Sequence, residues 1–158
     1  MSVYSINTSA PNLTVVCIDS NRPLAGRAYH YYAQEPQYVD SMYSVVELID
    51  NLCDEIDYPQ QSTRLRLFSP KEDSSKKEKT RETKKVAKRS ELLNQKGDMG
   101  TFIVHVQYRQ NSTWQGQVTW VDKEQTQNFR SVLELLKLMD SALDTVEEKA
   151  KTENRQEN

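Results

Sequence analysis

SVVELIDNLCDEID at residues 44–57 and SVLELLKLMDSALD at residues 131–144 are two versions of one amphipathic segment. Five of the fourteen positions are identical, and four more exchange one aliphatic or methionine side chain for another. Each version follows a strand-like run and a glycine, Gly26 in the first half of the chain and Gly116 in the second. Because whole units repeat, the sequence predicts a chain built from two related halves.

Both segments are predicted to form helices. Apolar side chains recur on one helical face of each, at Val45, Ile49, Leu52 and Ile56, and at Val132, Leu136, Met139 and Leu143. Ser44 with Glu47, and Ser131 with Glu134, have the spacing of a capping box, in which both side chains satisfy backbone N–H groups of the first turn. We therefore expect the helices to begin at these serines.

Strand-like runs precede each helix. Residues 13–18 and 27–32 are predicted strands, with a short third strand at 37–40, and the second half has strands at 101–109 and 117–121. Residues 60–68 fit either an additional strand or a short helix. The predicted fold class is α+β: two tandem β-β-(β)-α repeats, with antiparallel sheets each covered on one face by a helix, packed as a pseudo-symmetric pair.

Four segments are expected along the chain of 158 residues. These are a first repeat at 12–68, a basic and largely disordered linker at 69–98, a second repeat at 99–149, and a polar tail at 150–158. One repeat is near the lower size limit for independent folding, so the repeats should pack together or the chain should dimerise. Helix-forming residues from 84 to 95, followed by Gly97, also allow a solvated helix inside the linker.

The charge is distributed unevenly along the chain. Residues 71–89 contain nine of the 21 basic residues and four of the 23 acidic ones, so the rest of the chain carries 12 basic and 19 acidic residues, a net charge of −7. Cys17 and Cys53 form neither a disulfide framework nor a metal-ligand pair, which favours reduced thiols in a cytoplasmic protein. The N-terminus has no secretory pattern, and no run approaches the roughly 20 apolar residues of a membrane span.

No catalytic residue, metal ligand or cofactor is predicted. The chain has no phosphate-binding glycine loop, nucleophile elbow or paired-cysteine motif. His30 and His105 are the only imidazoles, and a partly buried, hydrogen-bonded side chain explains His30 better than catalysis. Cys17 and His30 fall on opposite faces of the predicted sheet, which disfavours a nucleophilic pair. A non-enzymatic binding or adaptor protein is the leading interpretation.

The expected contact surface lies in the second repeat. A tryptophan in a predicted loop exposes apolar surface unless it folds back onto the core or meets a partner. Beside it, hydrogen-bonding side chains alternate along the predicted strands. The candidate partner-binding residues are Arg109, Trp114, Gln115, Gln117 and Arg130, and the expected partner is another protein or a second copy of the chain.

Two other functions remain open. One is binding of RNA or single-stranded nucleic acid through the basic linker and sheet tyrosines, because clustered cations release counterions and aromatic rings stack on bases. Its candidate residues are Arg27, Tyr29, Tyr31, Lys76, Lys77, Lys84 and Lys85. The other is a small-ligand pocket, for example one that sequesters a nucleotide, at the seam between the repeats.

Several short motifs also resemble known sequences. YRQN at 108–111, WQG at 114–116, FRS at 129–131 and LELL at 133–136 are similar to short uncharacterised proteins of Gram-positive anaerobic, clostridial-type bacteria. GRAYHY at 26–31 and YPQ at 58–60 resemble a second such group associated with the same bacteria. Together the motifs span most of the chain outside the linker. The resemblance implies a bacterial, cytoplasmic context and no particular activity.

Overall fold

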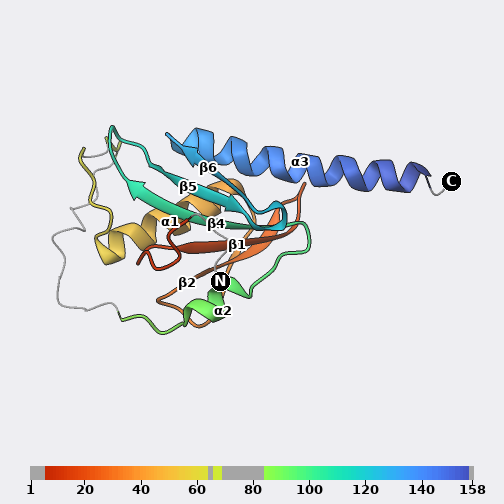
Figure 1. The fold of residues 1–158 in the computed structure, drawn as a ribbon. Coiled ribbons are helices and arrows are strands. Elements are labelled where there is room, and N and C mark those ends of the chain that lie inside the picture. Colours follow the sequence, from red (N-terminus) through yellow and green to blue (C-terminus); the bar gives the residue numbers. More distant parts are fainter. Residues whose placement is uncertain (1–5, 64–65, 69–83, 157–158) are drawn as a thin grey trace.

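One six-stranded antiparallel sheet forms the centre of the protein. The computed structural model describes residues 6–63, 66–68 and 84–156. The strands are β1 (Thr14–Ser20), β2 (Ala25–His30), β3 (Gln37–Val39), β4 (Gly100–Tyr108), β5 (Gln115–Trp120) and β6 (Gln125–Phe129). The helices are α1 (Met42–Ile56), α2 (Arg89–Leu93) and α3 (Val132–Gln156), and a 3₁₀ turn, η2, spans Val121–Lys123. The α+β class is therefore confirmed (Figure 1).

The two halves share this sheet instead of forming one sheet each. The strand order is β3-β2-β1-β4-β5-β6, so each half contributes three neighbouring strands and β1 pairs with β4 at the centre. The expectation of two separate sheets was wrong. The edge of either three-stranded sheet would leave a row of backbone groups unpaired, and pairing β1 with β4 satisfies both rows at once.

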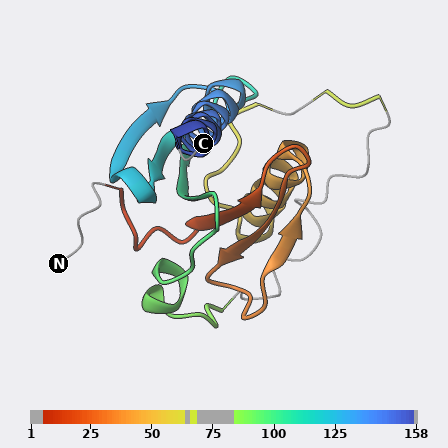
Figure 2. The ribbon, with the colours of Figure 1, turned by 90° about the vertical axis from the view of Figure 1, so that its right-hand side faces the viewer.

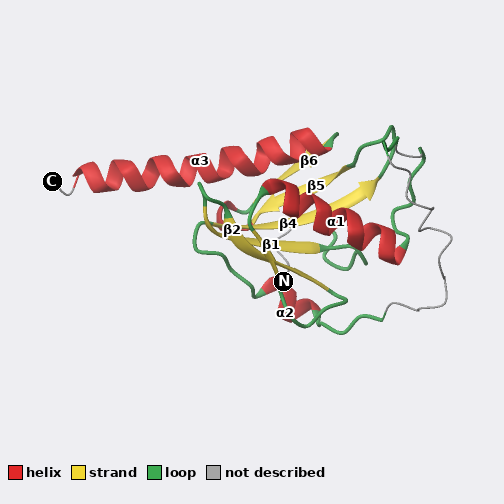
Figure 3. Ribbon diagram, turned by 180° about the vertical axis from the view of Figure 1, so that it is seen from behind, coloured by secondary structure: helices red, strands yellow, loops and turns green. Residues whose placement is uncertain are grey.

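Helices α1 and α3 cover the same face of the sheet (Figures 2 and 3). Val45 and Ile49 of α1, and Leu135 and Met139 of α3, are at most 1% exposed and belong to one apolar cluster with Phe102 and other strand residues. This is the face that the helical stripes of the sequence predicted. Helix α3 continues past the sheet to Gln156, so residues 150–156, predicted as a tail, are helical (Figure 1).

The opposite face is covered around β1 and β2 by segments that the sequence did not assign to the core. A second apolar cluster lies there. It contains Val15 and Cys17 of β1, Leu13 just before the strand, and Ile6 and Leu92. The backbone N–H groups of Val86 and Ala87 donate to the Tyr31 carbonyl at 2.7 and 3.0 Å. Residues 84–95 are thus no solvated helix: α2 has five residues and buries Leu92 against the sheet. The linker prediction for residues 69–83 lies outside the described residues.

The helix starts were predicted correctly in one case and one turn late in the other. Helix α3 begins at Val132, and Ser131 Oγ accepts from the Glu134 N–H at 3.1 Å. Helix α1 begins earlier, with Ser41 as its N-cap and Ser44 as its capping-box partner, so the Ser44–Glu47 box was wrong. Both serines can cap a helix, and the sequence alone does not rank them.

The remaining open segment forms little regular structure. Among the described residues of 60–68, Gln61 makes an isolated parallel bridge with Arg109, and no helix or named strand appears. Ser62 N–H donates to the Arg109 carbonyl at 3.1 Å. This segment therefore follows the end of β4 without becoming a seventh strand of the sheet.

Gly26 and Gly116 occupy similar places, each after a hairpin turn and opposite the end of the preceding strand. Neither glycine has a positive φ, so conformational freedom does not explain them. A Cβ at Gly26 would overlap the Cys17 carbonyl oxygen, and one at Gly116 would overlap the His105 carbonyl oxygen and meet the Phe129 ring at 2.9 Å. Close approach of neighbouring strands therefore excludes a side chain at both positions.

We predict that Gly116→Ala destabilises the protein by about 1–3 kcal/mol or more, because the added methyl group meets backbone that cannot yield locally. Gly100→Ala is the matched control, since its Cβ would meet only the Phe102 and Leu143 side chains, at 3.3 Å and beyond. Urea unfolding of both variants measures the difference. Equal stabilities would contradict the close-approach explanation.

Candidate functional site

Arg109 is a structural residue and not part of an exposed contact surface. It is 4% exposed, its Nη1 lies 2.6 Å from Asp54 Oδ1 and 3.6 Å from Asp50 Oδ1, and its Nε donates to the Pro59 carbonyl at 2.5 Å. These contacts fasten the end of β4 to α1 and to the segment after it. The prediction that Arg109 binds a partner is not supported by its burial.

The other predicted contact residues do not converge on one surface with it. Trp114 is 5% exposed and packs into the apolar cluster under the helices, so the loop tryptophan folds back onto the core. Gln115 bonds to both the N–H and the carbonyl of Gln110. Gln117 lies on the sheet face away from the helices, and Arg130 is exposed and paired with Glu134 at 2.9 Å.

Arg109 and Trp114 line a cavity of about 170 Å³ between the two halves, together with Asp50 and Thr113. Burial, with the nearby Asp54, raises the pKa of the Asp50 carboxyl, and Arg109 partly opposes this effect. The charged groups of this cavity therefore already interact with one another. A ligand would have to replace those contacts, which makes the cavity a poor place for a nucleotide.

Of the two tyrosines proposed for base stacking, Tyr31 is buried and Tyr29 is half-buried. Tyr31 is 3% exposed, its hydroxyl donates to the Thr8 carbonyl at 2.5 Å, and the Lys85 ammonium lies 4.5 Å from its ring centroid. Arg27 is paired with Asp19 at 3.3 Å and donates to the Tyr29 hydroxyl. These residues form no aromatic platform open to a base. Lys84 is exposed, whereas Lys76 and Lys77 lie outside the described residues.

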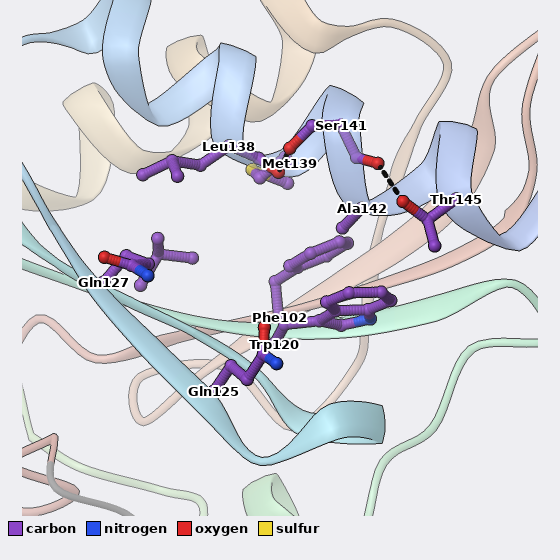
Figure 4. A pocket seen from close by; sticks show the side chains of 10 residues that line it. Phe102, Trp120, Gln125, Gln127, Leu138, Met139, Ser141, Ala142 and Thr145 are labelled. Atoms are coloured by element: carbon purple, nitrogen blue, oxygen red, sulfur yellow. Dashed lines mark hydrogen bonds between the residues drawn. The ribbon is translucent and has the colours of Figure 1, made fainter.

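A better-formed site lies between α3 and the outer strands of the second half. A cavity of about 220 Å³ opens there, with apolar side chains at its base and amide and hydroxyl groups around them (Figure 4). Its lining residues are Phe102, Val118, Trp120, Gln125, Gln127, Leu138, Met139, Ser141, Ala142 and Thr145. We call this the α3–β6 cleft.

The cleft contains a hydrogen-bond donor that is not used. Trp120 Nε1 is inaccessible to solvent and has no hydrogen-bond partner within the described part of the chain. By contrast, the Ser141 hydroxyl donates to the Leu138 carbonyl at 2.8 Å, and the Thr145 hydroxyl to the Ser141 carbonyl at 2.9 Å (Figure 4). A buried donor without a partner costs free energy, and because this N–H is inaccessible it is not exposed to a ligand in the cleft.

The cleft adjoins an edge of the sheet that pairs with no further strand among the described residues. Strand β6 is the outermost strand of the second half, and its sequence QTQNF contains neither a charged residue nor a proline. Gln125 and Gln127 point toward α3, while Thr126 bonds across the other face to Thr119 at 2.8 Å. Native edges are usually blocked by charges, prolines or bulges, and β6 carries none of these.

The cysteines and histidines form no catalytic pair. Burial raises the pKa of the Cys17 and Cys53 thiols to about 11, which makes both poor nucleophiles near neutral pH. His30 Nδ1 accepts from the Tyr32 N–H at 3.0 Å, whereas neither nitrogen of His105 has a partner in the ranges described. Burial lowers the pKa of both imidazoles. Cys17 lies in the cluster on the face away from α1, and His30 does not.

No group of three or more histidine, cysteine, aspartate or glutamate side chains in the described residues could hold a metal ion. No helix in the same ranges combines the length and apolar character needed to cross a membrane.

Comparisons with known proteins returned nothing: no protein-family model, curated protein or solved structure matches the chain.

Sequence reasoning missed the α3–β6 cleft. Residues 117–121, which include Trp120, were predicted only as a strand, and β6 was only the optional third strand of its half. A signal was present in the alternation of Gln125 and Gln127 beside Trp120, because amides facing a helix indicate an incompletely closed interface. Whether α3 closes over them depends on its path across the sheet, which no local pattern gives.

We predict that Arg109→Met lowers the free energy of unfolding by about 2–4 kcal/mol, because it leaves two carboxylates and the Pro59 carbonyl without their buried partner. Arg130→Met, which removes an exposed guanidinium, is the matched control and should leave the free energy of unfolding nearly unchanged. Urea unfolding measures both. A mild effect at Arg109 would show that its contacts are not structural.

A second prediction concerns acid. Because burial lowers the folded-state pKa of His105 below its unfolded value, the unfolded chain binds protons first, and stability falls as the pH drops through about 6.5. His105→Leu should remove part of this loss and flatten the decline of unfolding free energy between pH 7 and 5.5. Urea titrations across that range compare the variant with wild type. An unchanged slope would contradict the prediction.

Proposed function

We propose that the protein is a non-enzymatic binding module that takes up an extended peptide segment of a protein partner as an added strand on β6. The observation that carries the proposal is the open edge of β6 directly beside the α3–β6 cleft. The added backbone would pair with β6, and alternate side chains would enter the cleft. An edge strand supplies affinity through main-chain hydrogen bonds, and an adjoining pocket supplies specificity.

The size and chemistry of the cleft support a side chain as its occupant. Its volume of about 220 Å³ is below the roughly 300–1,000 Å³ of typical small-molecule sites. Phe102, Leu138 and Met139 give it an apolar base, and the Gln125 and Gln127 side chains offer polar contacts. An aliphatic or small aromatic side chain fits this combination better than a nucleotide, which needs cationic or backbone N–H groups around its phosphates.

The two halves give this proposal an evolutionary setting. We propose that they are repeats of one β-β-β-α unit, arranged as a pseudo-symmetric pair about the β1–β4 junction, where Val15 pairs with Ile103. In the first half the edge strand β3 has three residues, against five in β6. Specialisation of the second half for binding fits this difference. The buried, unreactive thiols are compatible with the proposed cytoplasmic location.

The alternatives have weaker support. For nucleic-acid binding, the lysines of the basic segment remain candidate contacts. However, Tyr31 is buried and Tyr29 is hydrogen-bonded to Arg27. Ligand binding at the seam between halves would use the cavity around Arg109, where acidic partners already occupy the guanidinium. Neither site combines an open hydrogen-bonding edge with unfilled space.

Affinity selection from a random hexapeptide library, in pools with free and with amidated C-termini, tests the proposal. We expect wild type to enrich peptides, and Ser141→Trp to weaken their binding at least about tenfold, because a bulky ring at this exposed position fills the mouth of the cleft. Lys137→Trp, at an exposed position of α3 outside the cleft lining, is the matched control and should bind normally.

Hydrogen exchange gives an independent readout, because an added strand should slow exchange of β6 amides. Failure of both pools to yield a binder, or equal binding by Ser141→Trp and wild type, would overturn the proposal. A concentration-dependent dimer in sedimentation velocity that Ser141→Trp disrupts would instead assign the edge to a second copy of the chain.

A further inference from the structure

The two proposed repeats match at a constant spacing along the chain. Gly26 of β2 pairs with Val39, the last residue of β3, and Gly116 of β5 pairs with Phe129, the last residue of β6. Helices α1 and α3 each begin three residues after the edge strand that precedes them. From the two glycines onward, each residue of the first half thus has a counterpart 90 positions later.

Burial along the two helices follows the same spacing. Three residues of α1 and their counterparts in α3 are at most 1% exposed: Val45, Ile49 and Cys53, and Leu135, Met139 and Leu143. Aligning the two similar sequence segments directly, at Ser44 and Ser131, would pair none of the three α1 residues with a buried one. The helices therefore correspond three positions away from the sequence match, because α1 begins earlier than its sequence predicts.

At one of these matched positions the helices differ in side-chain size. Leu52 of α1 is 2% exposed and lies on the same helical face as Ile49, which packs against the sheet. Its counterpart in α3 is Ala142, which lines the α3–β6 cleft (Figure 4). In the first half the helix itself buries a leucine side chain at this position. In the second half the helix supplies only a methyl group, and the cleft lies beside it.

The cleft also lacks the charges of the corresponding place in the first half. Gln125 and Thr145 line the cleft, and their counterparts are the exposed acids Glu35 and Glu55. None of the residues that line the cleft is charged. A charged side chain that entered it would lose water without gaining an ionic partner, which is costly. The cleft is therefore suited to an uncharged side chain.

The edge strands differ in their capacity to pair with an added strand. Pro36 directly precedes β3 and has no backbone N–H, whereas its counterpart Thr126 lies within β6 and has one. Proline beside a charged residue is a common way to block a sheet edge, and β3 is also only three residues long. The half that has the cleft is thus also the half with the edge that can accept a strand.

Resting on the proposed function, we propose that the partner strand places a leucine, or another aliphatic side chain of that size, in the α3–β6 cleft, and that Ala142 is the residue that selects it. The partner then supplies in the second half the kind of side chain that Leu52 supplies in the first. A larger aromatic ring would overpack this position and force the helix or the strand to move.

The peptide arm of the test uses hexapeptides selected on the wild-type chain. An alanine scan of each peptide identifies the position that contributes most to binding, and variants with leucine, alanine, phenylalanine or lysine there are compared by isothermal titration. We expect leucine to bind about tenfold more tightly than alanine, because the added aliphatic surface is partly buried. Phenylalanine should bind less tightly than leucine, and lysine no better than alanine.

The protein arm fills the cleft from the helix side. Ala142→Leu should weaken the leucine peptide at least about tenfold and remove its advantage over the alanine peptide. Urea unfolding should find this variant at least as stable as wild type, because its added side chain occupies space that Leu52 fills in the first half. Ala150→Leu, the same substitution at an exposed position of α3 outside the cleft lining, is the matched control and should bind as wild type does.

The outcomes separate this inference from the proposed function. Peptides that Ser141→Trp weakens but that show no preference for leucine, or that bind more tightly with phenylalanine, would overturn the inference and leave strand addition standing. A leucine preference that persists in Ala142→Leu would overturn the role of Ala142. Marked destabilisation by Ala142→Leu would show that the cleft does not hold a leucine side chain. If no peptide binds wild type, both proposals fall.

Discussion

The pairing of β1 with β4 is the constraint on which the rest of the structure depends. Val15, Val16, Cys17 and Ile18 of β1, and Phe102, Ile103 and Val104 of β4, are all at most 1% exposed. Because these central strands are buried on both faces, they carry apolar side chains on both of their sides. Because the two edges meet, α1 and α3 share one face of a single sheet. The segments 6–13 and 84–93 cover β1 and β2 from the other face.

The halves differ in how completely their helices close over the strands. Helix α1 is fastened by Arg109, whose guanidinium reaches Asp54 and the Pro59 carbonyl from the end of β4. The part of α3 beyond Met139 has no such ion pair with the sheet's outer strands among the described residues, and it leaves a cleft where Trp120 keeps an unpaired N–H. The ion pair of Arg109 thus holds α1 closely over the sheet, whereas α3 leaves a cleft beside β6.

Much of the fold was predictable, whereas the candidate site was not. Periodicity located both large helices and five of the six strands, because burial of one face imposes a period on the sequence. Arg109 and Trp114 were predicted as contacts because polar and aromatic residues in loops and at strand ends are usually exposed. Both are buried through contacts with distant residues: Arg109 with Asp54, fifty-five positions away, and Trp114 with the core beneath the helices. Sequence spacing carries no information about such partners.

The sequence by itself determined that the chain contains two similar strand-and-helix units, where their helices and most strands lie, and which helical faces are apolar. These properties follow from local periodicity, since each element must bury one side. Only the tertiary structure decided that the units share one sheet and that β6 is the outermost strand of the second half. Those features depend on how strand edges pair and on the path a helix takes across a sheet, which are set by contacts between residues far apart in the chain.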